Sequence, residues 1–193
     1  DPTADEYYEE LKSVRAAAGV VGYREPRMSL SAWTNHLAQL ALQQYRKRPP
    51  RYMASLGDDH YPTTKGWDRM LIEAIETSGK PGWAYGDDGI QRHRLPTAWV
   101  VSTPLVQALG YVMLPTCRHM YVDNAVLDLG RLTGRIHYVP EAKIDHRHPV
   151  GGRARWDKTY RGGLAAVHLD REAYDEWRAG GGLDADVAKV MKT

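Results

Sequence analysis

Strand-like and helix-like segments alternate through the first hundred residues, and this alternation is the feature that most restricts the fold. Four short apolar runs have the length and composition of strands: residues 20–23, 51–57, 83–85 and 97–102. Three longer segments read as helices that pack on those strands: residues 4–17, 29–45 and 66–78. Strands that alternate with helices predict an α/β fold with a largely parallel sheet.

The rest of the chain continues with short elements. Helices are expected over residues 103–110, 122–132, 171–178 and 184–192, and short strands over 136–139 and 142–144, on either side of Pro140. The two last helices are separated by three consecutive glycines, residues 180–182. We expect all four strands of the first hundred residues to share one sheet.

One strand ends in a group of side chains that suit a metal ion. The apolar run that begins at Tyr52 breaks at Gly57 and is followed at once by Asp58, Asp59 and His60. Two carboxylates in so small a volume repel each other, so the arrangement suggests that a cation lies among them. The alternative is a simple surface turn, because Gly-Asp-Asp is also favourable turn chemistry.

Two further clusters lie at predicted element ends. Asp123 stands at the start of a helix, where the ordinary role of a carboxylate is to cap the helix. His146 and His148 are two residues apart, so on a strand both could face one site. Histidines close to a proline are more often surface groups, but the first cluster needs a further ligand to complete a cation shell.

Composition and charge leave nucleotide binding open but restrict how phosphates could be held. The formal net charge is only +2, whereas modules that bind duplex nucleic acid usually carry a stronger basic bias. Local basic segments do occur at residues 46–51 and 147–161. The chain has no Gly-rich phosphate loop, so a divalent cation together with Arg and Lys is the expected substitute.

The sequence also bears on location. There is no run of about 18 apolar residues, and the acidic, polar first fifteen residues do not read as a signal peptide. Cys117 is the single cysteine, which fits a reducing compartment. We therefore expect no membrane span and a cytoplasmic location.

The motifs together resemble a known enzyme family. The run Leu56–His60, followed by Gly66-Trp67-Asp68 at a helix start, resembles nucleotide-sugar glycosyltransferases of the GT-A fold, similar to glycosyltransferase family 2. Those enzymes carry an Asp-x-Asp motif at a strand end, sometimes with His last, and here Asp58-Asp59-His60 would take that place. Tyr121–Asn124 is similar to the segment that contains their catalytic Asp, and Ile144–Pro149 resembles the segment of their late His metal ligand.

The resemblance covers roughly residues 1–160 and implies a GT-A-like, mostly parallel central sheet flanked by helices. The family begins with a strand-helix-strand unit, of which the first strand and part of the second are expected to be missing here. We therefore predict an N-terminally incomplete GT-A-like domain over residues 1–163 and a C-terminal helical extension over residues 164–193.

The function implied by the resemblance is inverting, metal-dependent transfer of a sugar from a nucleoside diphosphate sugar to an acceptor hydroxyl. The acceptor stays open between a saccharide, a protein, a lipid carrier and a modified nucleic acid. Mn²⁺ or Mg²⁺ would neutralise the leaving diphosphate, and imidazole ligands favour Mn²⁺. The implied metal ligands are Asp58, Asp59, His60, His146 and His148. The implied donor-binding residues are Trp33, Asn35, Asp58, Arg153, Arg155 and Lys158.

Asp123 is the implied general base toward the acceptor hydroxyl. Free amides at the helix start and a nearby cation would stabilise its anionic form and keep its pKa low. Two other functions stay open on the sequence. A metal-dependent phosphoesterase or nuclease would use the same Asp and His residues with a metal-bound water. A non-catalytic domain with a degenerate sugar-nucleotide site is the third possibility.

Overall fold

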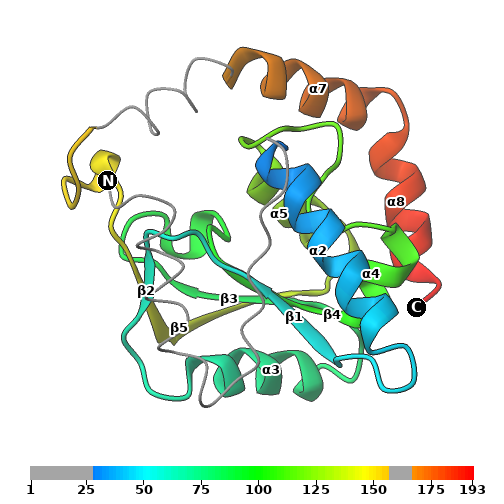
Figure 1. Ribbon diagram of the computed structural model, residues 1–193, viewed down its shortest axis with the longest axis horizontal. Coiled ribbons are helices and arrows are strands. Elements are labelled where there is room, and N and C mark those ends of the chain that lie inside the picture. The colour runs from blue at the N-terminus through cyan, green and yellow to red at the C-terminus, as the bar shows by residue number, and fades with distance from the viewer. Residues whose placement is uncertain (1–27, 157–166) are drawn as a thin grey trace.

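The computed structural model describes residues 28–156 and 167–193, which form a five-stranded sheet with helices on both faces (Figure 1). The strands are β1 (Tyr52–Ser55), β2 (His60–Pro62), β3 (Trp83–Asp87), β4 (Trp99–Ser102) and β5 (Ile136–His146). They lie in the order β1-β4-β3-β5-β2. The pairs β1/β4, β4/β3 and β5/β2 are antiparallel, and only β3/β5 is parallel. The sheet is therefore mixed and mostly antiparallel, and it curls into a half-barrel.

The prediction of a mostly parallel, GT-A-like sheet is wrong. Strand-helix alternation fixes strand direction only where each connecting helix returns the chain to a neighbouring position in the sheet. Here the connection from β3 to β4 holds only a short 3-10 turn, η2 (Arg92–Arg94), so these two strands pair antiparallel. β4 then lies between β1 and β3, which separates two strands that the alternation would have made neighbours.

The predicted strand positions are confirmed where the structure describes them. The runs 51–57 and 97–102 contain β1 and β4, and the run 83–85 forms the first part of β3, in one sheet, whereas 20–23 lies outside the described residues. The two strands expected around Pro140 are one strand, β5. Between Gly86 and Asp87 of β3 the partner on β5 jumps from Val139 to Lys143, so the proline lies in an irregular stretch that has no ladder partner on β3.

The described helices also follow the predicted segments. Ser29 caps the first of them, since its hydroxyl accepts a hydrogen bond from the amide of Ala32. The predicted helix over 4–17 lies outside the described residues. The α-helices of the described part are α2 (Leu30–Gln44), α3 (Trp67–Thr77), α4 (Thr103–Leu109), α5 (Val122–Thr133), α7 (Val167–Ala179) and α8 (Gly182–Met191).

Two apolar cores lie on opposite faces of the sheet, because alternate strand residues point to opposite sides. Helix α3 covers one face, with Leu71 and Ile75 against Ala84 of β3 and Ile144 of β5. The other helices lie on the opposite side of the sheet in Figure 1. There the core contains Trp83 and Trp99, the inward faces of α4 and α5, and residues of the C-terminal helices such as Trp177 and Val190.

Candidate metal centre

Strand pairing brings the first and third sequence clusters together. The turn after β1 carries Asp59, and β2 begins at His60, while β5 ends at His146. In the β2/β5 ladder His60 is paired directly with His146, and their rings stack with centroids 4.0 Å apart and planes 20° apart. Two segments more than eighty residues apart in the sequence thus present their imidazoles side by side.

The carboxylate of Asp59 contacts a nitrogen at the edge of each of these two rings. One oxygen, Oδ1, is 3.1 Å from Nδ1 of His60, and the other, Oδ2, is 3.3 Å from Nε2 of His146. One ligand atom from each residue falls within 4.8 Å of the others, which is close enough for a shared ion. The side chains of Asp59, His60 and His146 are only 18%, 6% and 13% exposed, so solvent screens their charges weakly.

Nδ1 of His60 is close to two groups, the amide of Gly57 at 3.2 Å and Oδ1 of Asp59 at 3.1 Å. Donor atoms bound at right angles to one ion by bonds of about 2.1 Å are themselves about 3.0 Å apart. The observed spacing therefore suits a bound divalent cation.

The other two predicted ligands lie at the margin of this group. Asp58 is exposed and is not part of the three-residue group, so the aspartate of the centre is Asp59. The ring of His148 is 5.1 Å from that of His146, centroid to centroid. Its Nδ1 accepts from the amide of Val150 and caps the 3-10 turn η3 (Pro149–Gly151). Burial lowers the pKa of His148, and the neighbouring charge of His146 adds to that shift.

The structure adds a residue that the sequence reasoning did not select. Asp88 follows β3 and is 3% exposed, and its Oδ2 lies 3.5 Å from Nδ1 of His146. The backbone carbonyl of Asp88 also accepts from the amide of His146 at 3.1 Å. The signal was present in the sequence, because Gly-Asp-Asp occurs at the end of β3, at residues 86–88, as it does shortly after β1.

The charges of the centre are strongly coupled. Burial opposes a charge on His146, but the nearby carboxylates of Asp59 and Asp88 outweigh it and raise the pKa of His146 to about 9. Burial likewise opposes ionisation of Asp59, yet its hydrogen bond to His146 helps to hold the pKa of this carboxyl well below its usual range. The metal-free centre is therefore an ion pair at neutral pH, with a proton on His146 that a metal ion must displace.

Asp123 lies near the centre, in the first turn of α5. It is half-buried, and its Oδ1 accepts from the amide of Asn124 at 2.9 Å. Burial raises the pKa of Asp123, and the Asn124 amide and the charges of His119 and His146 offset this rise only in part. The lowering expected from the sequence included a bound cation, whereas in the metal-free protein burial prevails over the amide at the helix start. A carboxylate of raised pKa is the stronger base.

Two residues of α2 were predicted to bind the sugar donor, and one of them, Asn35, contacts a loop of the protein. Asn35 donates to the carbonyl of Met113 and accepts from the amides of Val112 and Met113, at 2.8 to 3.0 Å. All three contacts hold the loop that leads from α4 toward α5 and Asp123. Trp33 is partly buried and stacks on His36, with ring centroids 5.7 Å apart.

The predicted phosphate-binding residues are placed differently. Arg153 lines a polar cavity of about 370 Å³ and pairs with Asp145, the residue before His146. Arg155 is exposed, and Lys158 lies outside the described residues. The cavity is lined by Thr63, Asp87, Gly89, Arg92, Lys143, Asp145 and Arg153. Of the predicted basic residues that the structure describes, Arg153 thus lines a cavity, but none of Asp59, His60 and His146 lines the same cavity.

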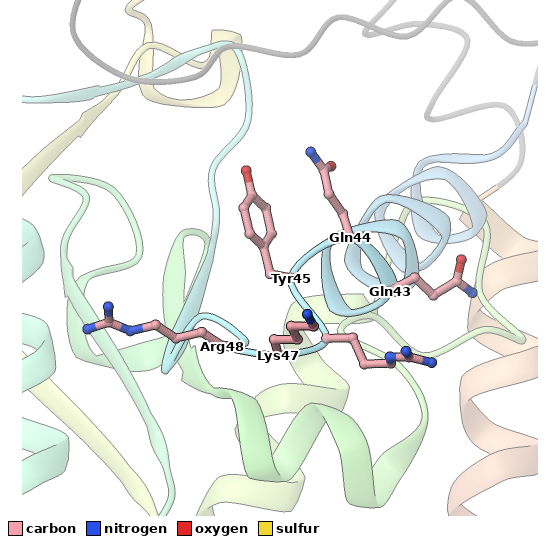
Figure 2. A pocket seen from close by; sticks show the side chains of 6 residues that line it. Gln43, Gln44, Tyr45, Lys47 and Arg48 are labelled. Atoms are coloured by element: carbon pink, nitrogen blue, oxygen red, sulfur yellow. The ribbon is translucent and has the colours of Figure 1, made fainter.

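A second hollow, of about 510 Å³, surrounds the basic turn that ends α2. Figure 2 shows side chains of residues 43–48 spreading from this turn in different directions. Within the described ranges, six consecutive residues line it, and no residue of the metal centre is among them. The hollow is therefore the solvated surface of a basic turn, and it adds nothing to the candidate site.

Comparison with known proteins leaves the site as the basis for any functional conclusion. No family model, curated protein or solved structure matches this chain. Among the described residues, no helix has both the length and the apolar character needed to cross a membrane.

Proposed function

We propose that this protein is a metal-dependent glycosyltransferase that moves a sugar from a nucleoside diphosphate sugar to an acceptor hydroxyl. The observation that carries the proposal is the group formed by Asp59, His60 and His146, with Asp123 close enough to interact electrostatically with His146. The proposal rests on this site and not on the fold, since one reaction can be carried by unrelated folds.

The ligand set favours Mn²⁺ or a similar transition metal. Two imidazoles and one carboxylate suit manganese, iron or zinc, whereas Mg²⁺ prefers oxygen ligands and retains several waters. When bound, the ion would neutralise the charge that builds on a leaving diphosphate. Asp59, His60 and His146 would hold it.

Two further groups fit the proposed reaction. Arg153 pairs with Asp145, the residue before His146, and offers a guanidinium, which binds phosphate oxygens with two parallel hydrogen bonds. Asp123, whose pKa is raised by burial, would take the proton from the acceptor hydroxyl as that oxygen attacks the sugar carbon. Because one carboxylate serves as the base and no covalent intermediate is involved, the reaction would invert the sugar configuration.

The test is release of nucleoside diphosphate from a panel of nucleotide sugars. The protein is incubated with UDP-, GDP- and dTDP-sugars and Mn²⁺, with and without simple saccharide acceptors, and the diphosphate is quantified. We expect release from at least one donor, its loss in EDTA and its loss in His60→Gln, a variant that lacks one metal ligand.

Other outcomes would redirect the proposal. Cleavage of bis(p-nitrophenyl) phosphate without any turnover of nucleotide sugars would identify a metal-dependent phosphoesterase. Mn²⁺-dependent binding of a nucleotide sugar without turnover would identify a binding domain. Absence of Mn²⁺ binding would remove the basis for all three functions.

A further inference from the structure

The carboxylate of Asp88 is held rigidly by hydrogen bonds that approach it from one loop. Its Oδ1 accepts from the amides of Ile90, Gln91 and Arg92 at 2.9, 2.6 and 2.7 Å. Its Oδ2 accepts from the hydroxyl of Thr97 at 2.9 Å. A buried carboxylate with four donors cannot rotate without breaking several charge-assisted hydrogen bonds.

His146 turns one ring nitrogen toward this carboxylate. Its Nδ1 lies 3.5 Å from Oδ2 of Asp88, and no other group in the described part of the chain offers it a closer partner. An ionised carboxylate can only accept, so a neutral imidazole in this position is stable with its hydrogen on Nδ1. The lone pair of His146 then lies on Nε2, the nitrogen that is 3.3 Å from Asp59.

We propose that Asp88 is a positioning residue of the metal centre, which fixes His146 in the tautomer that can bind a metal through Nε2. The inference rests on the metal centre of the proposed function and does not depend on which reaction the metal serves. A histidine ligand whose second nitrogen donates to a carboxylate is oriented and made more basic by that carboxylate.

Replacement by asparagine would reverse this preference. The amide side chain introduced by Asp88→Asn has one oxygen and one NH₂ group. Only the oxygen can accept the hydrogen bonds that the three loop amides now donate to Oδ1. The NH₂ group must then face Thr97 and Nδ1 of His146. A donor at that position favours the tautomer with hydrogen on Nε2, which blocks the lone pair that a metal needs.

Asp87 provides a matched control, because it is the other aspartate of the same Gly-Asp-Asp turn. As adjacent residues of an extended segment, Asp87 and Asp88 point to opposite sides of the sheet. Asp87 pairs with Lys143 at 2.8 Å and has no contact with His146 among the described residues. Asp87→Asn therefore removes the same charge from the same turn without changing the group that faces His146.

The experiment measures Mn²⁺ affinity of the full chain by calorimetry and by the EPR signal of free Mn²⁺. We expect Asp88→Asn to bind Mn²⁺ about 10- to 100-fold more weakly than the wild type, the range for loss of a carboxylate behind a histidine ligand. Asp87→Asn should bind Mn²⁺ within about twofold of the wild type. Circular dichroism and thermal unfolding of both variants report whether the fold is retained.

A second measurement needs no variant. In the wild-type protein loaded with diamagnetic Zn²⁺, long-range ¹H–¹⁵N NMR reports which nitrogen of His146 carries the proton. We expect a proton on Nδ1 and a metal-shifted Nε2. This spectroscopic signature would not arise from a residue that only stabilised the fold.

The outcomes separate the inference from the proposed function. Wild-type protein that binds neither Mn²⁺ nor Zn²⁺ overturns the metal centre itself. Wild-type protein that binds the metal through Nδ1 of His146 overturns the role of Asp88 alone, as does a folded Asp88→Asn variant that keeps wild-type affinity. If Asp88→Asn does not fold, the NMR measurement on the wild type decides the question.

Discussion

Metal binding to this centre should depend steeply on pH, because the ion and a proton compete for His146. The pKa of this histidine is raised from 6.5 to about 9 in the metal-free protein. Burial works against that rise, so the two carboxylates that flank the ring, Asp59 and Asp88, must supply it. Below about pH 9 each bound metal ion therefore has to displace one proton.

The size of the effect follows from that pKa. The apparent affinity falls by the factor 1 + 10^(pKa − pH), which for a pKa of about 9 is about 1000 at pH 6 and about 11 at pH 8. Mn²⁺ should accordingly bind about 90-fold more tightly at pH 8 than at pH 6. A histidine with the ordinary pKa of about 6.5 would give only about a fourfold gain over the same interval. The two cases are far enough apart to be decided by one titration series.

Calorimetry supplies the assay and an internal check. Mn²⁺ is titrated into the protein at half-unit steps from pH 6 to pH 8, in two buffers with different heats of ionisation. The dependence of the binding enthalpy on the buffer gives the number of protons released, which should be close to one at pH 7. The variant His148→Gln is the control and should keep the same slope, because the pKa of His148 is lowered by burial first and then by His146. A fourfold gain or less, with no proton release at pH 7, would refute the reasoning about His146.

Three further predictions concern the base, the ion pair and the sheet. Asp123→Asn should lower sugar transfer at least about 100-fold, the low end for loss of a general base, while Mn²⁺ affinity measured by calorimetry stays within about twofold; near wild-type transfer would leave Asp123 as a structural residue of α5. The raised pKa of His146 stabilises the metal-free fold fully below about pH 6.5, and this stability, up to about 3 kcal/mol, is lost as the pH rises through about 9; urea unfolding in EDTA from pH 6 to pH 10 measures it, and a flat profile would contradict it. Gly86→Ala should cost several kcal/mol in urea unfolding, because a Cβ would lie 2.0 Å from the carbonyl oxygen of Ala142, whereas Gly66→Ala, which meets no atom within 4 Å, should cost only about 1 to 2 kcal/mol from its positive φ; equal costs would show that β3 and β5 can separate to make room.

Local pattern predicted the elements well and their arrangement poorly, and the two results have one physical cause. Each element is specified by residues that are close in the sequence, such as the apolar runs of β1 and β4 and the N-capped segment of α2. Strand order is set by which apolar faces meet in the folded chain. No local pattern showed that β4 would lie between β1 and β3.

The residues of the candidate site were likewise predicted only in part from the sequence. Residue type and position at a strand end were enough to select His60 and His146, and the β2/β5 ladder places them opposite each other. The choice between Asp58 and Asp59 depended on the conformation of a four-residue turn, which composition does not specify. Asn35 was selected for a donor contact, but its amide is used by the loop at residues 112–113, a partner that lies nearly eighty residues away.

The two Gly-Asp-Asp turns show how one local sequence can acquire two roles from its neighbours. After β1, the second aspartate of the turn is Asp59, which contacts a nitrogen of each of two imidazoles and is a metal ligand in the proposed centre. At the end of β3, the second aspartate is Asp88, which accepts hydrogen bonds from three loop amides and a hydroxyl and also faces His146. With its oxygens engaged in this way, Asp88 has little capacity left for a metal ion, but it can still dictate which nitrogen of His146 is protonated. In this proposal the same residue type thus serves once as a metal ligand and once behind a metal ligand.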